Sequence, residues 1–273
     1  AIACLDLLVD MGVPIENIIA TDKDGVIHDG RKNEMHVKQS RYAQKTDIRS
    51  LGEVIDGADV FLGLSAPNVL TPEMLQTMAS KPLIMALANP VPEIMPDLAQ
   101  EARPDAIVAT GRSDFPNQVN NVLCFPFIFR GALDVGATTI NEEMKIATVK
   151  AIANLARVES SDVVAQAYGD ENLNFGPGYI IPKPFDPRLI SEIAPAVAKA
   201  AMTSGVATRP ITDMDAYIQQ LDEFVWRSGN VMKPVIDRAI SDPKRVVYAE
   251  GEERRVLHAA QVVIDEGMAS PVL

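Results

Sequence analysis

Short apolar runs alternate with helix-forming segments through the first half of the chain, and this alternation restricts the fold more than any other feature. Runs typical of buried strands occupy residues 17–21, 59–64, 83–87 and 106–109. Helical patterns lie at residues 1–11 and 51–55, and another helix starts at Thr71, whose capping hydroxyl precedes a proline and an acid. Apolar strands separated by helices are typical of a parallel sheet covered on both faces, so we predict a doubly wound α/β fold.

The second half is mainly helical and ends in a second α/β pattern. From residue 119 the pattern becomes helical, with helices predicted at 141–158, 190–203 and 214–240 and an irregular Pro/Gly-rich stretch at 175–187. After the break at 241–244 come a strand at 245–249, a helix at 252–266 and a strand at 271–273. We therefore expect a first α/β domain with trailing helices at 1–201, a helical connector at 202–243 and the start of a second α/β domain at 244–273.

Both ends of the sequence are abrupt. Residue 1 is alanine rather than methionine and opens an amphipathic run with no capping residue before it, and the sequence stops inside an apolar run. We expect from this an internal fragment of a longer protein, whose sheet lacks its first strand. An exposed strand edge would make such a fragment marginally stable when isolated.

Composition argues against several classes of function. The formal net charge of −12 is unfavourable for general nucleic-acid binding. No apolar run approaches the roughly 20 residues of a membrane span, so no membrane partner is expected. Cys4 and Cys124 are too few for a disulfide framework or a zinc site, and together with the acidic composition they favour a cytoplasmic protein.

Two adjacent amides, Asn120 and Asn121, close a polar loop that follows the predicted strand at 106–109. Loops at the carboxyl ends of parallel strands bind ligands in α/β proteins, and paired amides offer donors and acceptors to an oxygen-rich ligand. The alternative is that one of them only caps the following helix.

Asp22 follows the predicted strand at 17–21, where dinucleotide-binding folds of the Rossmann type place an acid that binds the ribose. The glycine turn for the pyrophosphate would then lie before residue 1. An ordinary turn aspartate is the alternative.

A basic loop follows Asp22. Residues 31–45 contain one acid, Glu34, and five basic residues, which give a local charge of +4: Arg31, Lys32, Lys38, Arg41 and Lys45. Such a loop suits the 2′-phosphate of NADP, and a solvated surface is the alternative. We predict NADP binding through some of Lys23, Lys38 and Arg41, although an acid such as Asp22 normally favours NAD.

Four motifs in the first half carry a specific resemblance: GLSAPN at 63–68, ALANPVPE at 86–93, ATGRSDFPNQVNN at 109–121 and FPFIFRGALD at 125–134. With them the chain resembles the bacterial NADP-dependent malic enzymes of the long form, which carry a phosphotransacetylase-like domain at their C-terminal end. The tail RVVYAEGE at 245–252 resembles the start of that domain, with Ala249 where the pattern has proline.

The resemblance implies oxidative decarboxylation of L-malate to pyruvate and carbon dioxide with reduction of NADP, or of NAD as the alternative. It places Asn121 and Asn89 at the substrate, and Asn89 at the nicotinamide ribose as well. Ser65 would line the cofactor site, with capping of its loop as the alternative. The ligands of a Mg or Mn ion, the lysine base and the tyrosine acid would lie upstream of residue 1, so the resemblance assigns no catalytic residue or metal ligand to this chain.

The resemblance also implies a homo-oligomer with acetyl-CoA as an effector. Two alternatives to this function remain open. The chain could act chiefly as a regulatory and oligomerisation element that responds to acetyl-CoA, or it could be part of a different Rossmann dehydrogenase. On the malic enzyme reading, the chain alone is expected to be inactive.

Overall fold

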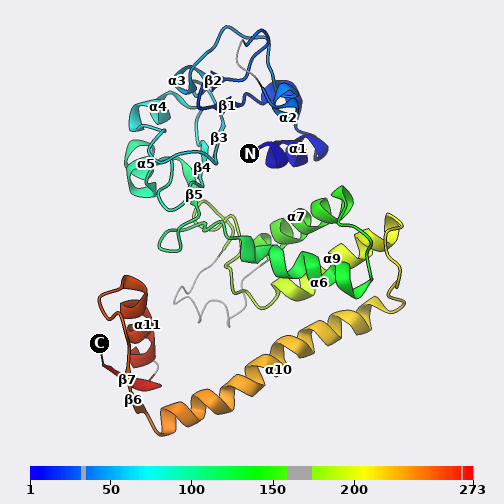
Figure 1. Ribbon diagram of the computed structural model, residues 1–273, viewed down its shortest axis with the longest axis vertical. Coiled ribbons are helices and arrows are strands. Elements are labelled where there is room, and N and C mark those ends of the chain that lie inside the picture. The colour runs from blue at the N-terminus through cyan, green and yellow to red at the C-terminus, as the bar shows by residue number, and fades with distance from the viewer. Residues whose placement is uncertain (32–34, 159–173, 266, 273) are drawn as a thin grey trace. The chain divides into compact units, whose positions relative to one another are not determined.

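Three of the four strands predicted in the first half form one parallel sheet in the computed structural model (Figure 1). They are β3 (Val60–Gly63), β4 (Leu83–Ala86) and β5 (Ile107–Thr110), in the order β3-β4-β5. The register pairs Gly63 with Ala86 and Ala86 with Thr110, so the three strands end at the same level. The parallel α/β fold is thereby confirmed.

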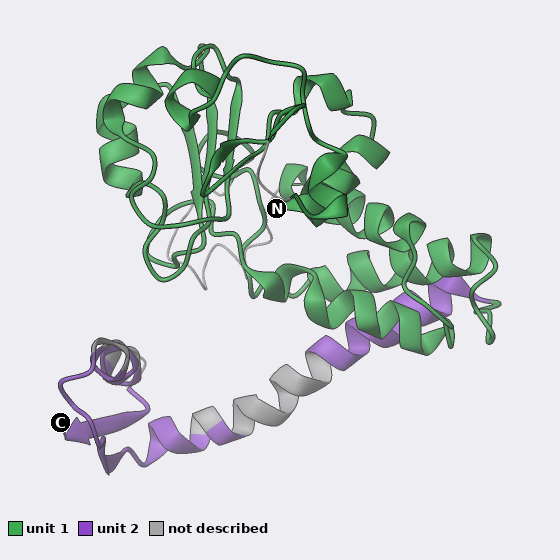
Figure 2. Cartoon of the chain, turned by 45° about the horizontal axis from the view of Figure 1, so that its top comes forward, with its two compact units in different colours: residues 1–212 green, residues 213–273 purple. Residues whose placement is uncertain are grey.

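The structure describes residues 1–31, 35–158, 174–265 and 267–272. They form two compact units, residues 1–212 and residues 213–273 (Figure 2). The sheet β3-β4-β5 and all of the predicted substrate and cofactor residues belong to the first unit.

One face of the sheet carries the main apolar core, together with α3 (Leu51–Val54), α4 (Pro72–Thr77) and α5 (Pro96–Ala102). Because side chains alternate along a strand, Ile84 and Ala86 of β4 face this core. The other buried members of the core are Ile55, Phe61, Leu70, Leu75, Met78, Ile94, Ala99 and Ala106.

Helix α7 (Glu142–Arg157) lies over the opposite face. An apolar cavity of about 270 Å³ separates Met85 and Ala109 of the sheet from Val149 and Ile152 of α7. Helix α9 (Leu189–Thr203) packs against both α7 and α6 (Phe125–Asp134). Helices α3, α4 and α5 therefore cover one face of the sheet, and a cavity lies between the other face and α7.

The strand predicted at 17–21 is correct only at its last residue. The segment follows α1 (Ile2–Asp10) with a 3-10 turn, Ile15–Asn17, and only Thr21–Asp22 (β1) is extended, paired antiparallel with Gly25–Val26 (β2). Gln44 Nε2 donates to the carbonyls of Ile15 and Ile18 at 2.9 and 3.0 Å. A strand needs a neighbouring strand to pair its backbone groups. In this segment the backbone groups are paired by the Gln44 side chain and by β2, so the segment does not join the main sheet.

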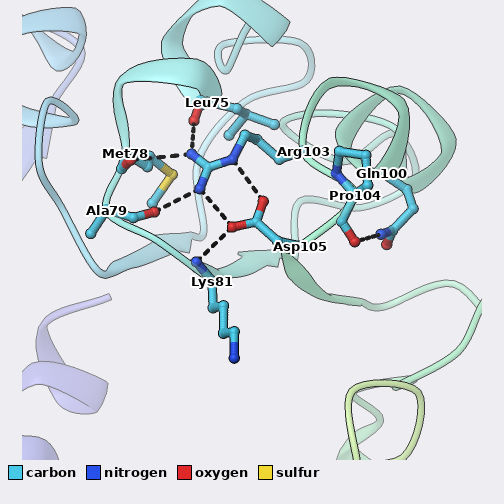
Figure 3. Close-up of polar contacts among 8 residues, drawn as sticks. All are labelled: Leu75, Met78, Ala79, Lys81, Gln100, Arg103, Pro104 and Asp105. Atoms are coloured by element: carbon cyan, nitrogen blue, oxygen red, sulfur yellow. Dashed lines mark hydrogen bonds and ion pairs between the residues drawn. The ribbon is translucent and has the colours of Figure 1, made fainter.

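Arg103 fastens the end of α4 to the loop before β5, at the amino-terminal edge of the sheet (Figure 3). Its Nη1 donates to the carbonyls of Leu75 and Met78 at 2.7 and 3.1 Å, and its Nη2 donates to that of Ala79 at 2.8 Å. Nε and Nη2 also donate to the carboxylate of Asp105 at 2.8 and 2.9 Å. All five guanidinium N–H groups therefore have acceptors, and terminal carbonyls of α4 are satisfied.

We expect Arg103→Lys to lower the free energy of unfolding by about 2 kcal/mol, because an ammonium cannot reproduce the planar set of five donors and leaves helix-end carbonyls unpaired. Thermal unfolding measures the loss, and an unchanged midpoint would contradict this role.

Arg103 also holds the pKa of Asp105 well below its ordinary value of 3.8. The stability from this pair is present above pH 3.8 and is lost as the pH falls from there toward the lowered pKa.

The second unit contains α10 (Met214–Ser241), β6 (Lys244–Val247), α11 (Arg254–Asp265) and β7 (Ala269–Val272). Strands β6 and β7 pair in parallel, so the predicted strand-helix-strand order is correct. Glu266 and Leu273, at the ends of two predicted elements, lie outside the described residues. The predicted domain boundaries after residues 201 and 243 stay predictions, and the two units divide after Thr212.

Candidate functional site

Three loops follow the carboxyl ends of the parallel strands along one edge of the sheet. They span residues 64–71 after β3, residues 87–95 after β4 and residues 111–120 after β5. Ser65 lies in the first loop, Asn89 in the second, and Asn121 directly after the third, and all three residues are exposed. The structure thus places these predicted residues at the edge where parallel α/β folds bind ligands.

The first two loops are bonded to each other. Leu87 N–H donates to the carbonyl of Gly63 at 3.2 Å, Asn68 N–H to that of Pro92 at 3.1 Å, and Leu70 N–H to that of Glu93 at 3.1 Å. The side chain of Glu93 is fully buried between the loops. Sequence reasoning assigned it no role, although an acid between Pro92 and Ile94 in a largely apolar segment is a signal that it has a buried partner.

Asn117 anchors the third loop and was also missed. Its Nδ2 donates to the carbonyls of Val108 and Pro177 at 3.0 and 2.7 Å, and its Oδ1 accepts from Ile180 N–H at 2.9 Å. The residue is 5% exposed and has a positive φ of 53°, a conformation that asparagine adopts more readily than most residues. These bonds fix the loop both to β5 and to the segment at 177–180.

The two adjacent amides have different environments. Asn120 caps the 3-10 helix Asn121–Leu123, since its Oδ1 accepts from Val122 N–H at 3.0 Å. The side chain of Asn121 is exposed and makes no hydrogen bond within the described part of the chain. Capping therefore occupies Asn120 and leaves Asn121 available to a ligand.

Asp22 is engaged in a bidentate ion pair. Arg31 donates from Nη1 and Nη2 to its two carboxylate oxygens at 3.0 and 2.6 Å, and Arg31 Nη2 lies 3.3 Å from Asp24 Oδ2. The Arg31 side chain is only 6% exposed. Its hydrogen bonds hold the pKa of Asp22 below the ordinary value of 3.8, so Asp22 is a carboxylate at neutral pH with its charge already compensated.

The basic residues predicted for the 2′-phosphate lie in two places. Lys23 follows Asp22 at the hairpin and is exposed, and Lys38 is an exposed residue of α2 (Val37–Ser40). Arg41 Nη1 donates to Asp6 Oδ1 at 2.9 Å, and the buried Tyr42 hydroxyl donates to the same oxygen at 2.7 Å. Burial and the neighbouring Asp6 raise the pKa of Tyr42 to about 12. Lys32 and Glu34 lie outside the described residues.

Within residues 1–31, 35–158, 174–265 and 267–272, no group of three or more His, Cys, Asp or Glu side chains is arranged to hold a metal ion. None of the helices in the same ranges combines the length and apolar character of a bilayer span.

A parallel sheet with polar loops at the carboxyl ends of its strands is typical of the class of α/β domains that bind dinucleotides. Residues 8–167 match the family described as malic enzyme, NAD binding domain, and residues 230–273 match the phosphate acetyl/butaryl transferase family. The chain belongs to the malic enzyme family, and the resemblance found in the sequence is confirmed.

Similar proteins include the NADP-dependent malic enzyme of Salmonella typhimurium, 65% identical over the whole chain, and an NAD-dependent malic enzyme of Rhizobium meliloti, 63% identical over the whole chain. The chain spans 36% of the length of each. Among solved structures, the malic enzyme of Entamoeba histolytica is 32% identical with a TM-score of 0.71, and that of Pyrococcus horikoshii is 34% identical with a TM-score of 0.70. The matches cover 86% and 85% of this chain and 48% and 52% of those proteins.

Proposed function

We propose that the protein containing this chain oxidises and decarboxylates L-malate to pyruvate and carbon dioxide while reducing NADP. One observation carries the proposal: Ser65 and Asn89 lie in the loops after β3 and β4, and Asn121 lies directly after the loop that follows β5, in a chain of the malic enzyme family. NADP, when bound, would supply the acceptor for the hydride that leaves C2 of malate.

Neutral amides suit the substrate side of this site. Malate is a dianion, and the amide of Asn121, which makes no hydrogen bond within the described residues, can donate to one of its carboxylates. Because the amide is neutral, it adds no positive charge that would stabilise the carboxylate lost as carbon dioxide. Asn89, exposed in the neighbouring loop, is proposed to bind both the nicotinamide ribose and the substrate. Asn117 and Asn120 hold the third loop in shape rather than binding the ligand.

The exposed polar groups of the first loop suit the ribose of a dinucleotide. The exposed loop at 64–68 offers the Ser65 hydroxyl oxygen, whose own proton is donated to Glu93, as an acceptor for a ribose hydroxyl. The Mg or Mn ion that the reaction needs, with its acid and base, is assigned to residues outside this chain. A homo-oligomer and a response to acetyl-CoA belong to the same proposal, the latter through the segment at 230–273 that matches the acyltransferase family.

The proposal is tested with the full-length protein, NADP, malate and Mg ions or Mn ions. The expected result is equal amounts of NADPH, pyruvate and carbon dioxide. Accumulation of oxaloacetate without carbon dioxide would indicate a different dehydrogenase. The 273-residue chain alone is expected to give no product, so turnover by that chain would show that the machinery assigned elsewhere lies within it.

We propose that NADP is preferred over NAD, which the names of close relatives do not decide because they include both cofactors. An acid at the position of Asp22 would repel a 2′-phosphate, but the bidentate contact from Arg31 offsets this charge. Some of Lys23, Lys38 and Arg41 then supply the positive charge that the phosphate needs, and Arg41 would share its charge with Asp6.

Lys38→Glu combined with Arg41→Glu is expected to raise the KM for NADP about tenfold or more and to change the KM for NAD far less, because only NADP carries the 2′-phosphate. Steady-state kinetics with both cofactors measure this. Lys199→Glu, a reversal at an exposed lysine of α9, is the matched control. Equal changes for both cofactors would mean that the basic loop is only a solvated surface.

A further inference from the structure

Glu93 places a carboxylate at the ligand edge of the sheet with no exposure to solvent. Its Oε1 accepts from the backbone N–H of Ser65 at 2.8 Å and from the Ser65 hydroxyl at 3.3 Å. Its Oε2 accepts from the backbone N–H of Ala88 at 3.0 Å. One side chain thus bonds the loop after β3 with one oxygen and the loop after β4 with the other.

The position of the carboxylate is sterically defined. A Cβ at Gly63, the last residue of β3, would lie 2.5 Å from Cδ and 2.7 Å from Oε1 of Glu93. The carboxylate therefore occupies the space directly beside the strand end, which only a glycine there leaves open. No lysine, arginine or histidine forms a salt bridge with Glu93 within the described residues, so backbone amides and one hydroxyl supply its hydrogen bonds.

A buried carboxylate is costly, and an apolar side chain would fill the same space without that cost. What Glu93 adds is a fixed distance between two backbone amides in different loops. Ser65 is itself exposed at the proposed cofactor site, and Ala88 directly precedes the exposed Asn89. A change in the bond geometry at Glu93 would therefore move both ligand-facing residues.

We propose that Glu93 is a positioning residue for the cofactor: it sets the spacing between the Ser65 and Asn89 loops and thereby determines the affinity for NADP. This inference rests on the proposed function. It concerns a residue that does not contact the cofactor itself and acts through the amides of Ser65 and Ala88.

Glu93→Gln is the informative substitution, because the shape is retained while one acceptor oxygen becomes an NH2 donor. Both oxygens of Glu93 are acceptors from N–H groups, so in the variant one loop amide faces a donor. The Kd for NADPH of the full-length variant, measured by fluorescence titration well below its unfolding temperature, is expected to rise about tenfold or more. The matched control is Glu101→Gln, at an exposed glutamate of α5 with no bonded partner within the described residues, which should leave the Kd unchanged.

Hydrogen exchange in the unmodified protein gives a second test that does not depend on folding of a variant. Without cofactor, the amides of Ser65 and Ala88 should exchange at least tenfold more slowly than that of Ala66, which donates no backbone hydrogen bond within the described residues. Equal exchange rates, or a folded Glu93→Gln variant with a lower melting temperature and an unchanged Kd, would overturn the proposal. If the unmodified protein binds no NADPH, the proposed function fails, and the exchange rates still decide whether Glu93 holds the loops.

Discussion

Replacing Asn121 by alanine in the full-length protein is expected to lower kcat/KM for malate about ten- to a hundredfold. A hydrogen bond to a charged group contributes roughly 1.5–3 kcal/mol, and the loss of that free energy corresponds to this change in kcat/KM. The reason is that the Asn121 side chain is exposed at the ligand edge and has no hydrogen-bond partner within the described residues. Its removal would therefore cost substrate binding without unfolding a structural contact. Steady-state kinetics with malate as the varied substrate measure the effect.

Asn120→Ala is the matched control at the adjacent position. Asn120 caps the helix Asn121–Leu123 through Val122 N–H, so its loss should cost roughly 1 kcal/mol of stability and leave malate kinetics nearly intact. Melting curves of both variants complete the comparison. If Asn120→Ala damages turnover and Asn121→Ala lowers only the melting temperature, the assignment of the two amides is reversed.

Gly131→Ala is expected to destabilise the first unit by about 2 kcal/mol, a fall of about 4–8 °C in Tm. Gly131 lies in α6 where this helix crosses α9, and a Cβ there would lie 2.4 Å from the carbonyl oxygen of Ala194 and 2.8 Å from Cβ of Val197. Two helix backbones rather than a flexible side chain would have to separate, so the gain in helix propensity from alanine cannot offset the strain.

The control for this prediction is Gly52→Ala in α3, where a Cβ would meet only the end of Met74 at 3.6 Å. That variant should be neutral or more stable by up to about 1 kcal/mol. Equal melting temperatures for the two alanine variants would show that α6 and α9 do not need the close approach at Gly131.

The sequence predicts the strands of the parallel sheet well, where each apolar run pairs with another predicted strand. β3, β4 and β5 lie within the predicted ranges or one residue beyond, because each is a short apolar run bounded by turn or helix signals. The segment at 17–21 is also apolar, but it is bonded to the Gln44 side chain and to β2 rather than to a parallel strand. The apolar composition of a segment does not indicate which strand it pairs with. Helix α5 was not predicted, although Pro96 and Asp97 are typical of a helix start. The helix has only seven residues, which is too short for a clear helical pattern.

The positions of the exposed candidate residues could be predicted from the sequence, and those of the buried residues that support their loops could not. Ser65, Asn89 and Asn121 lie in motifs at predicted strand ends, so their common edge follows from parallel topology. Glu93 bonds Ser65 across 28 positions, and Asn117 bonds Pro177 across 60 positions. No periodicity or spacing rule connects residues so far apart, and only the folded chain shows that they meet.

The central claim is that the loops after β3, β4 and β5 form the binding site for NADP and the substrate. A crystal structure of the full-length protein with NADPH and pyruvate tests it most directly. The account predicts the nicotinamide ribose within hydrogen-bond distance of Asn89 and the pyruvate carboxylate within hydrogen-bond distance of the Asn121 amide. Ligands bound elsewhere, with these three loops open to solvent, would contradict it.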